Sequence, residues 1–267
     1  MEQAEDFKAE CAALYDLVAE LSDAEFDQKT AFKGWTLNNV FRHLHVWNQA
    51  ANLTLTDGQG FLDYLKVVQE NGKAGGTLIG FEERWLDGLS GTSLRETWRE
   101  YYDEVGGNYA TVDPSKRLKW GGPDMSARSC ISARLMETWA HGQEIYDQLG
   151  VVRKNQDRIR NIVILGINTY GWTYAVREET APDPKPYVNL TAPSGEEWTF
   201  NDPSADDLIE GAAEDFCQVV TQVRNIADTS LRVIGPNATD WMSKAQCFAG
   251  AAQPPPAPGT RVTRKAW

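Results

Sequence analysis

Apolar residues recur three or four positions apart through most of the first 150 residues, which is the spacing of amphipathic helices. The predicted helices cover about residues 5–21, 37–51, 61–69, 78–86, 93–109 and 126–150. A glycine-rich stretch at 72–76 separates the third helix from the fourth. The four longest segments, joined by one partly helical crossover, indicate a four-helix bundle.

Hydroxyl side chains stand where three of these helices should begin. Thr36 precedes the second helix, and Ser126 precedes the last. We expect both to act as N-caps, because a hydroxyl oxygen can accept a hydrogen bond from a free amide of the first turn. Ser93 stands three residues before Glu96, which predicts a capping box at the start of the fifth helix.

The pattern changes after Gly150. A helix is predicted over about 156–176, and strands over 187–191 and 197–200 should form a hairpin around Pro193-Ser194-Gly195. The remaining predictions are a short strand near 208–209, a helix over 212–223, a strand over 231–234 and a helix over 237–249. This mixed order predicts a second, smaller domain of the α+β class.

We therefore divide the chain into three parts. Residues 1–152 form the helical bundle, residues 153–252 form the α+β domain, and residues 253–267 form a proline-rich tail. The tail has four prolines within six residues and should be disordered.

Composition narrows the choice of partners. With 267 residues, of which 42% are hydrophobic, the chain can bury a substantial core. Its formal charge of −12 argues against binding nucleic acid or an anionic membrane, since both would repel such a surface. The chain has no run of about 18 apolar residues and no basic, apolar N-terminal signal, which predicts a soluble cytoplasmic protein. The four cysteines lack paired spacing and should be reduced thiols.

The candidate chemistry centres on the last helix of the bundle. Glu137 and His141 are four residues apart, so a helix places them on one face, where they could share a divalent cation. The only other histidines are His43 and His45, and either could complete a site of two histidines and one carboxylate. Both flank the apolar stripe of the second helix, so periodicity does not choose between them. The alternative is that Glu137 and His141 lie on a solvated face.

Two motifs resemble a known family. Gly34-Trp35-Thr36 with His43 on the following helix, and the run Met136-Glu137-Thr138-Trp139-Ala140-His141-Gly142, resemble the DinB-like metal-binding bundle of mycothiol-dependent maleylpyruvate isomerases. The run 120–150 is similar to a branch of that superfamily labelled "wyosine base formation". Segments within 215–224 and 235–250 resemble the sterol-carrier-protein-like C-terminal domain of that branch.

The resemblance implies a site. It implies His43, Glu137 and His141 as metal ligands, because the family places its first histidine seven residues after the threonine of the Gly-Trp-Thr turn. His45 has no counterpart in the family pattern. Arg224 is the nearest match to a functional arginine of the C-terminal domain. The resemblance further implies a divalent metal, zinc or else nickel, and a low-molecular-weight thiol as cosubstrate.

These inferences predict a metal-dependent enzyme of thiol chemistry. It would be either a thiol-dependent cis–trans isomerase or a thiol S-transferase, acting on a small anionic electrophile that Arg224 would bind. The alternative is a non-catalytic protein that binds a metal or a small ligand. The expected partners are the small-molecule substrate and the thiol, without nucleic acid or membrane. The sequence leaves the oligomeric state open, a homodimer included.

Overall fold

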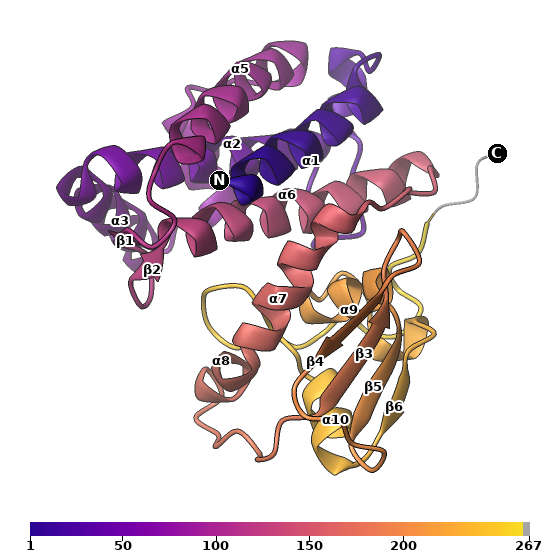
Figure 1. Ribbon diagram of the computed structural model, residues 1–267. Coiled ribbons are helices and arrows are strands. Elements are labelled where there is room, and N and C mark those ends of the chain that lie inside the picture. The colour runs from indigo at the N-terminus through magenta and orange to yellow at the C-terminus, as the bar shows by residue number, and fades with distance from the viewer. Residues whose placement is uncertain (264–267) are drawn as a thin grey trace. The chain divides into compact units, whose positions relative to one another are not determined.

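The computed structural model describes residues 1–263, and the chain divides into two compact units, Met1–Gln148 and Leu149–Trp267 (Figure 1). The first unit is almost entirely helical, and the second combines helices with a sheet. This arrangement confirms the predicted fold class, a helical bundle followed by a smaller α+β region. None of the helices among the described residues is long and apolar enough to span a membrane.

Six α-helices build the first unit. They are α1 (Glu2–Val18), α2 (Leu37–Thr56), α3 (Gly58–Lys73), α4 (Leu78–Trp85), α5 (Gly91–Ala110) and α6 (Ala127–Leu149). A 3-10 turn, η1 (Asp23–Asp27), and two short paired strands, β1 (Arg117–Leu118) and β2 (Met125–Ser126), complete the unit. Helix α2 is central, since it packs against α3, α4 and α5, while α1 packs against α5.

The predicted N-cap of α2 is confirmed. The Thr36 hydroxyl oxygen accepts from the Asn39 amide at 3.1 Å, and the Asn39 side chain accepts from the Thr36 amide at 3.0 Å. A tight turn precedes this cap, in which the Trp35 amide donates to the Phe32 carbonyl at 2.9 Å. Its two central residues, Lys33 and Gly34, have φ of 52° and 70°, a conformation that glycine adopts without strain. The turn therefore fixes where Trp35 enters α2.

The predicted capping box at Ser93 is wrong, because α5 begins earlier, at Gly91. The first-turn amide of Thr92 donates to Asp23 of η1 at 2.8 Å, so a residue distant in sequence supplies the acceptor. Glu96 accepts instead from the Tyr15 hydroxyl at 2.8 Å. Tertiary contacts thus replaced the local cap that the sequence suggested.

Helix α6 has the predicted bounds, and the Ser126 hydroxyl oxygen caps it by accepting from the Ser129 amide at 3.1 Å. The face that carries Glu137 and His141 is not solvated. Their side chains are 24% and 13% exposed, and Glu144 further along this face is 2% exposed. Helix α6 therefore buries polar residues on the side opposite its apolar stripe.

A small aromatic core fixes α4 beside α2. It consists of Val46 and Ala50 of α2, Phe61 and Tyr64 of α3, and Phe81 of α4. Burying such side chains stabilises the packing by about 1.5–3 kcal/mol for each large residue. Phe81 immediately precedes Glu82, so this core also sets the position of the Glu82 backbone.

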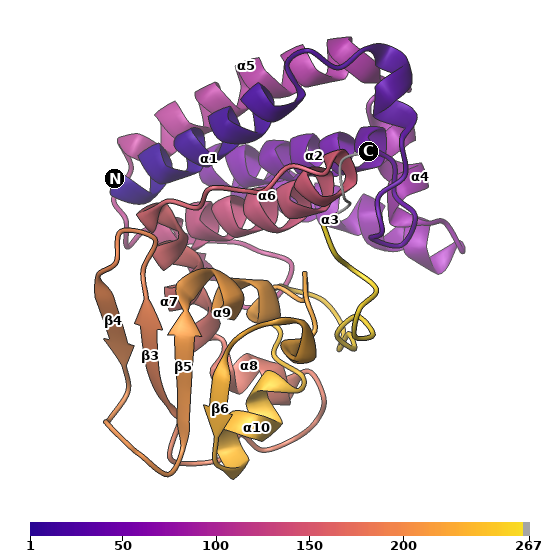
Figure 2. The ribbon, with the colours of Figure 1, turned by 90° about the vertical axis from the view of Figure 1, so that its right-hand side faces the viewer.

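The second unit contains a four-stranded mixed sheet. Its elements are η2 (Asp157–Ile159), α7 (Arg160–Asn168), α8 (Tyr170–Ala175), β3 (Tyr187–Thr191), β4 (Glu197–Phe200), β5 (Leu208–Ala212), α9 (Ala213–Val220), η3 (Ile226–Asp228), β6 (Arg232–Ile234) and α10 (Pro236–Met242). The strand order is β4-β3-β5-β6; β3 pairs with β5 in parallel, and the two outer pairs are antiparallel (Figure 2). Helix α9 packs on β3 and β5, and α7 packs on α9.

Two predicted helices of this unit are shorter than expected. The helix over 156–176 is broken at Thr169, whose hydroxyl donates to the Leu165 carbonyl at 2.7 Å where α7 ends. The last helix ends at Met242 instead of continuing to 249. Beyond it, the Gln246 amide donates to the Thr173 hydroxyl at 3.1 Å, so tertiary contacts take up the backbone.

The first part of the predicted tail makes hydrogen bonds with the folded unit. The Gln253 amide donates to Gln246 at 2.9 Å, Asn225 donates to the Pro256 carbonyl at 2.9 Å, and the Gly259 amide donates to Asp228 at 2.8 Å. Side chains of the folded unit thus contact Gln253, Pro256 and Gly259 on either side of and within the proline-rich stretch. The last four residues of the predicted tail, 264–267, lie outside the described residues.

Candidate metal centre

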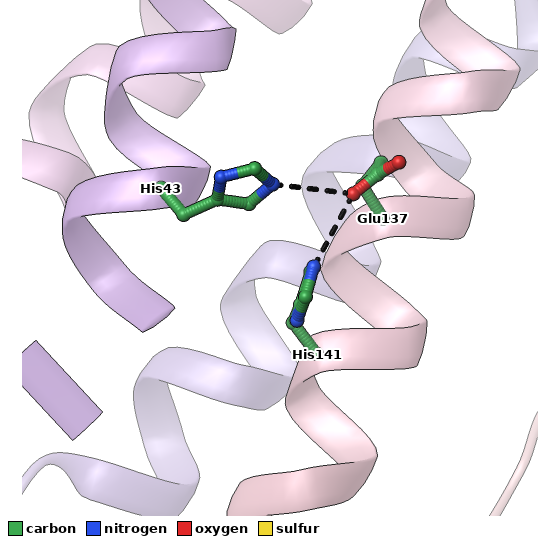
Figure 3. Close-up of side chains that lie close together, drawn as sticks. All are labelled: His43, Glu137 and His141. Atoms are coloured by element: carbon green, nitrogen blue, oxygen red, sulfur yellow. Dashed lines mark ion pairs between the residues drawn. The ribbon is translucent and has the colours of Figure 1, made fainter. Parts of the chain in front are cut away.

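The structure brings together His43, Glu137 and His141, three of the five residues that the sequence singled out. His43 projects from α2 toward Glu137 and His141 of α6, and one carboxylate oxygen of Glu137 lies between the two rings (Figure 3). Glu137 Oε2 is 3.5 Å from His43 Nε2 and 3.4 Å from His141 Nε2. One potential ligand atom from each residue lies within 4.8 Å of the other two.

These separations fit a divalent cation. Two ligand atoms that each lie about 2.0–2.1 Å from an ion, at a tetrahedral angle, are about 3.4 Å apart. The measured 3.4 and 3.5 Å match that spacing. The donors, two imidazoles and a carboxylate, are those that zinc and similar transition metals bind. Two of the three ligand-to-ligand separations, and the types of donor, therefore fit such an ion.

His43 has a second carboxylate behind it. Its Nδ1 lies 2.8 Å from Oε1 of Glu82, a fully buried residue of α4. The indole N–H of Trp47 donates to the same oxygen at 3.1 Å. Because a carboxylate accepts, His43 Nδ1 carries a proton, and Nε2 faces Glu137.

Aromatic rings of the turn before α2 cover the two histidines. The Trp35 ring stacks on His141, with centroids 5.5 Å apart and planes inclined by 6°. It meets His43 edge-on at 5.3 Å, and Phe32 meets His141 edge-on at 5.1 Å. The Gly-Trp-Thr turn therefore does more than cap a helix, since it also restricts both imidazole rings.

Arg134 ties α6 to α2 beneath the cluster. It is 2% exposed, its Nε donates to Asn48 at 3.0 Å, and its Nη2 donates to the Leu44 carbonyl at 3.4 Å. Burial lowers the pKa of Arg134, and the nearby charge of Glu137 opposes that shift. The guanidinium thereby fixes the spacing between the helices that supply the two histidines.

The pKa values of the three clustered residues are shifted in different directions. Burial lowers the pKa of His43, but Glu82 and Glu137 outweigh it and raise the value to about 9. Burial would raise the pKa of Glu137, yet hydrogen bonds from both imidazoles hold it well below its usual range. Burial and the charge of His43 lower the pKa of His141. A cation entering the cluster thus meets an ionised carboxylate and one neutral imidazole.

His45 does not join the cluster. It is 2% exposed, its Nε2 lies 3.1 Å from the amide nitrogen of Gln49, and the ring of Tyr101 meets it edge-on at 5.2 Å. Burial lowers its pKa to about 4. Of the two histidines that periodicity left open, the structure places His43 beside Glu137 and His141.

Comparisons with known proteins bear on the family of this chain. The sequence profile described as "Mycothiol maleylpyruvate isomerase N-terminal domain" matches residues 7–146. Two curated relatives, each described as an uncharacterized protein of Mycobacterium tuberculosis, are 35% identical over 246 residues, 92% of this chain and 94% of theirs. The chain belongs to the mycothiol maleylpyruvate isomerase N-terminal domain family.

Solved structures show the same fold in this family. A crystal structure of the mycothiol-dependent maleylpyruvate isomerase has a TM-score of 0.52 and 14% identity, covering 82% of this chain and 87% of that one. A histidine-to-alanine mutant of that isomerase has a TM-score of 0.51 and 13% identity, with the same coverage. At such low identity, the similarity establishes the fold alone.

Arg224 belongs to the second unit, so the cluster forms without it. It follows α9, is 7% exposed, and its Nη1 donates to the Val223 carbonyl at 3.3 Å. It is therefore not the surface arginine that a helix end would often carry. A functional role for Arg224 in this family member stays a prediction.

The sequence analysis missed Glu82. Its signal lies in the predicted helix over 78–86, where the apolar residues Leu78 and Phe81 form the inward stripe. Glu82 is four residues after Leu78 and therefore takes a position on that stripe. A lone carboxylate at an inward position is unusual enough to mark it for attention.

Proposed function

We propose that this protein is a metal-dependent enzyme of low-molecular-weight thiol chemistry. It would act as a thiol-dependent cis–trans isomerase or a thiol S-transferase on a small anionic electrophile. The observation that carries the proposal is the cluster of His43, Glu137 and His141, in which Glu137 Oε2 lies from both rings at the spacing of two ligand atoms that share one ion. Membership of a family named for a mycothiol-using isomerase supports the thiol, and mycothiol is the first to test.

The residues would hold zinc, or nickel when that metal is supplied. A divalent ion bound by two imidazoles and one carboxylate keeps an open position, where it would lower the pKa of a bound thiol. Trp35 and Phe32 hold the rings of the two histidines and shield that side from water. The protein's own contribution is thus to orient the ligands and to keep their surroundings partly apolar.

The proposed reaction consumes no oxidant. The thiol sulfur adds to one carbon of an activated double bond, and the π electrons move onto the conjugated carbonyl group. Rotation about the new single bond follows, and return of the electrons breaks the C–S bond and releases the thiol. If the neighbouring carbon instead takes up the proton that the thiol lost, the thiol stays attached and the reaction is an S-transfer.

Arg224 would bind the anionic end of the substrate. A guanidinium can donate two parallel hydrogen bonds to one carboxylate, which a lysine cannot do. Arg224→Ala should keep the bound metal and raise KM, and Arg224→Lys should recover only part of the activity. Unchanged kinetics in Arg224→Ala, with the melting temperature confirming the fold, would remove Arg224 from the site.

The decisive experiment is a turnover screen with the purified full-length protein. Zinc-loaded protein is mixed with mycothiol or glutathione. Each thiol is paired with maleylpyruvate or with a chlorinated aromatic electrophile, from which the thiol sulfur would displace chloride. We expect turnover with at least one pair, loss of that turnover in His141→Ala, and its retention in His45→Gln. Absorbance of substrate and product follows the reaction.

A second outcome would favour the other function. If the protein binds zinc but turns over none of the pairs, the non-catalytic reading as a metal- or ligand-binding protein gains support. Equal turnover in wild type and His141→Ala would also contradict the proposal, because the clustered residues would then play no part.

A further inference from the structure

Glu82 is the residue next to the cluster whose position calls for a reason. It comes from α4, outside the four long helices, and its side chain is fully buried. Its Oε1 meets the Nδ1 of His43 at 2.8 Å and the indole N–H of Trp47 at 3.1 Å. Two donors on one oxygen hold the carboxylate in a single orientation.

The other oxygen of Glu82 makes the burial costly. Oε2 has no hydrogen-bond partner within residues 1–263, and in that part of the chain no lysine or arginine forms an ion pair with Glu82. Moving an ionised carboxylate out of water is unfavourable unless a nearby positive charge compensates it. His43 is the one positively chargeable side chain that contacts Glu82 in this part of the chain. A cation bound to His43 would therefore also stabilise the buried carboxylate of Glu82.

The opposite nitrogen of His43 points to the cluster. With Nδ1–H directed at Glu82, Nε2 is the ring nitrogen that faces Glu137 Oε2, 3.5 Å away, and its lone pair would be the one that binds a metal. A partner of this kind sets both the tautomer and the ring orientation of a metal-ligating histidine, and it raises the basicity of the ligand nitrogen. The tautomer follows from Glu82 being the acceptor at Nδ1.

We propose that Glu82 is a positioning residue of the metal centre, which orients His43 through Nδ1 and supplies a second negative charge. Two carboxylates, Glu137 on one side of His43 and Glu82 on the other, would balance the charge of a divalent ion when both are ionised. A monovalent ion would leave one buried charge unbalanced. The proposal rests on the metal-binding half of the proposed function and is independent of the thiol reaction.

The role of charge can be separated from that of shape. Glu82→Gln keeps the side-chain length and an oxygen that can accept from His43 and Trp47, but removes the charge. Glu82→Ala removes both. Glu83 is a matched control, because it neighbours Glu82 on α4, pairs with Arg42 at 3.1 Å and has a side chain 55% exposed.

The test measures zinc affinity of the metal-free full-length chain with a chromophoric competitor. Loss of such outer partners typically weakens metal binding about 10- to 100-fold, and we expect about tenfold for Glu82→Gln and about 100-fold for Glu82→Ala. Glu83→Gln should match wild type. The visible spectrum of the cobalt-substituted protein should shift in Glu82→Gln, which a merely structural role would not cause.

Each result decides the matter. Zinc affinity and cobalt spectrum in Glu82→Gln that match wild type would overturn the proposal. Failure of wild type to bind zinc would overturn it together with the metal half of the proposed function, whereas zinc binding without turnover would leave it standing. If Glu82→Gln does not fold, Trp47→Phe removes the other donor to Oε1 and should weaken zinc binding several-fold; no change there would count against the proposal.

Discussion

His43 and His45 stand two residues apart on α2, and both are buried, at 8% and 2% exposure. Carboxylates surround His43, and its pKa is raised to about 9. Neutral partners surround His45: Gln49 donates to its Nε2, and Tyr101 packs against its ring. Its pKa is lowered to about 4 because burial acts there without an opposing charge.

The difference shows that burial alone does not assign a role to a histidine. A network fixes the neutral partner of His45, since Trp85 Nε1 donates to Gln49 Oε1 at 3.0 Å, which turns the amide nitrogen of Gln49 toward His45. The ring nitrogen that could bind a metal is therefore already occupied by a hydrogen bond. On His43 the corresponding nitrogen faces an ionised carboxylate instead.

Replacement of each histidine by glutamine should give the largest difference in zinc affinity. We expect His43→Gln to weaken zinc binding by more than about 100-fold, since loss of even an outer partner of a ligand costs about 10- to 100-fold. His45→Gln should leave the affinity within about threefold of wild type. Metal content after dialysis and competition titration measure both. Metal loss in His45→Gln with retention in His43→Gln would reverse our assignment of the ligand.

The next largest effect should be on how the free energy of unfolding changes with pH, to which His45 contributes in its own way. The folded-state pKa of His45 lies below its unfolded value, so its unprotonated form contributes stability above about pH 6.5, and that contribution is lost as pH falls toward 4. Linkage gives a loss of about 2 kcal/mol on going from pH 8 to pH 5. His45→Gln should lack that part of the loss. Urea denaturation of the metal-free proteins at both pH values measures the difference.

Agreement of the two proteins at both pH values would contradict this prediction. It would mean that water reaches His45 and that its ring is protonated in the folded state as readily as in the unfolded chain. His45→Phe provides a second variant in case the glutamine finds a new partner.

Aromatic neighbours offer a matched pair. Trp35 stacks on His141 and meets His43, whereas Trp85 holds the amide that occupies His45. Aromatic pairs contribute about 0.5–1.5 kcal/mol, so Trp35→Ala should weaken zinc binding about 2- to 13-fold. Trp85→Ala should leave zinc affinity unchanged. Equal effects of the two substitutions would mean that ring contacts do not orient the ligands.

Local signals in the sequence predicted the parts of the site that lie within one helix. The spacing of Glu137 and His141 and the cap at Thr36 needed only the geometry of a helix, and both are present in the structure. Periodicity did not separate His43 from His45, because each borders the apolar stripe. The resemblance chose His43 from its distance to Thr36, and the structure places that residue in the cluster.

Contacts between distant segments could not be predicted from the sequence. Glu82 lies 39 positions from His43, and the Asp23 that caps α5 lies 69 positions from Thr92. Such pairs depend on how helices pack, which no local pattern encodes. The same reason explains why the tail was expected to be disordered: its hydrogen-bond partners, such as Asn225, belong to other parts of the folded unit.

Cys130 is a second buried side chain with a neutral partner, and its replacement should have the smallest effect on zinc affinity. It lies on α6 seven residues before Glu137, so it could have lined the site, but it is fully buried, and the hydroxyl of Tyr109 lies 3.1 Å from its sulfur. Like His45, it has a neutral partner, and burial raises its pKa to about 11. We expect Cys130→Ser to bind zinc within about threefold of wild type.

The thiol itself should be inert. At pH 7.5 a pKa of about 11 leaves roughly 0.03% of Cys130 as thiolate, against roughly 9% for an ordinary thiol with a pKa of about 8.5. Iodoacetamide should therefore label the Cys130 peptide in urea but not in the native protein, as measured by mass spectrometry. Because only the thiolate reacts, any native labelling should rise about tenfold per pH unit. Rapid native labelling at pH 7.5, or loss of zinc in Cys130→Ser, would show that a buried group with a neutral partner can still take part in metal chemistry, and the contrast between His43 and His45 would then need another cause.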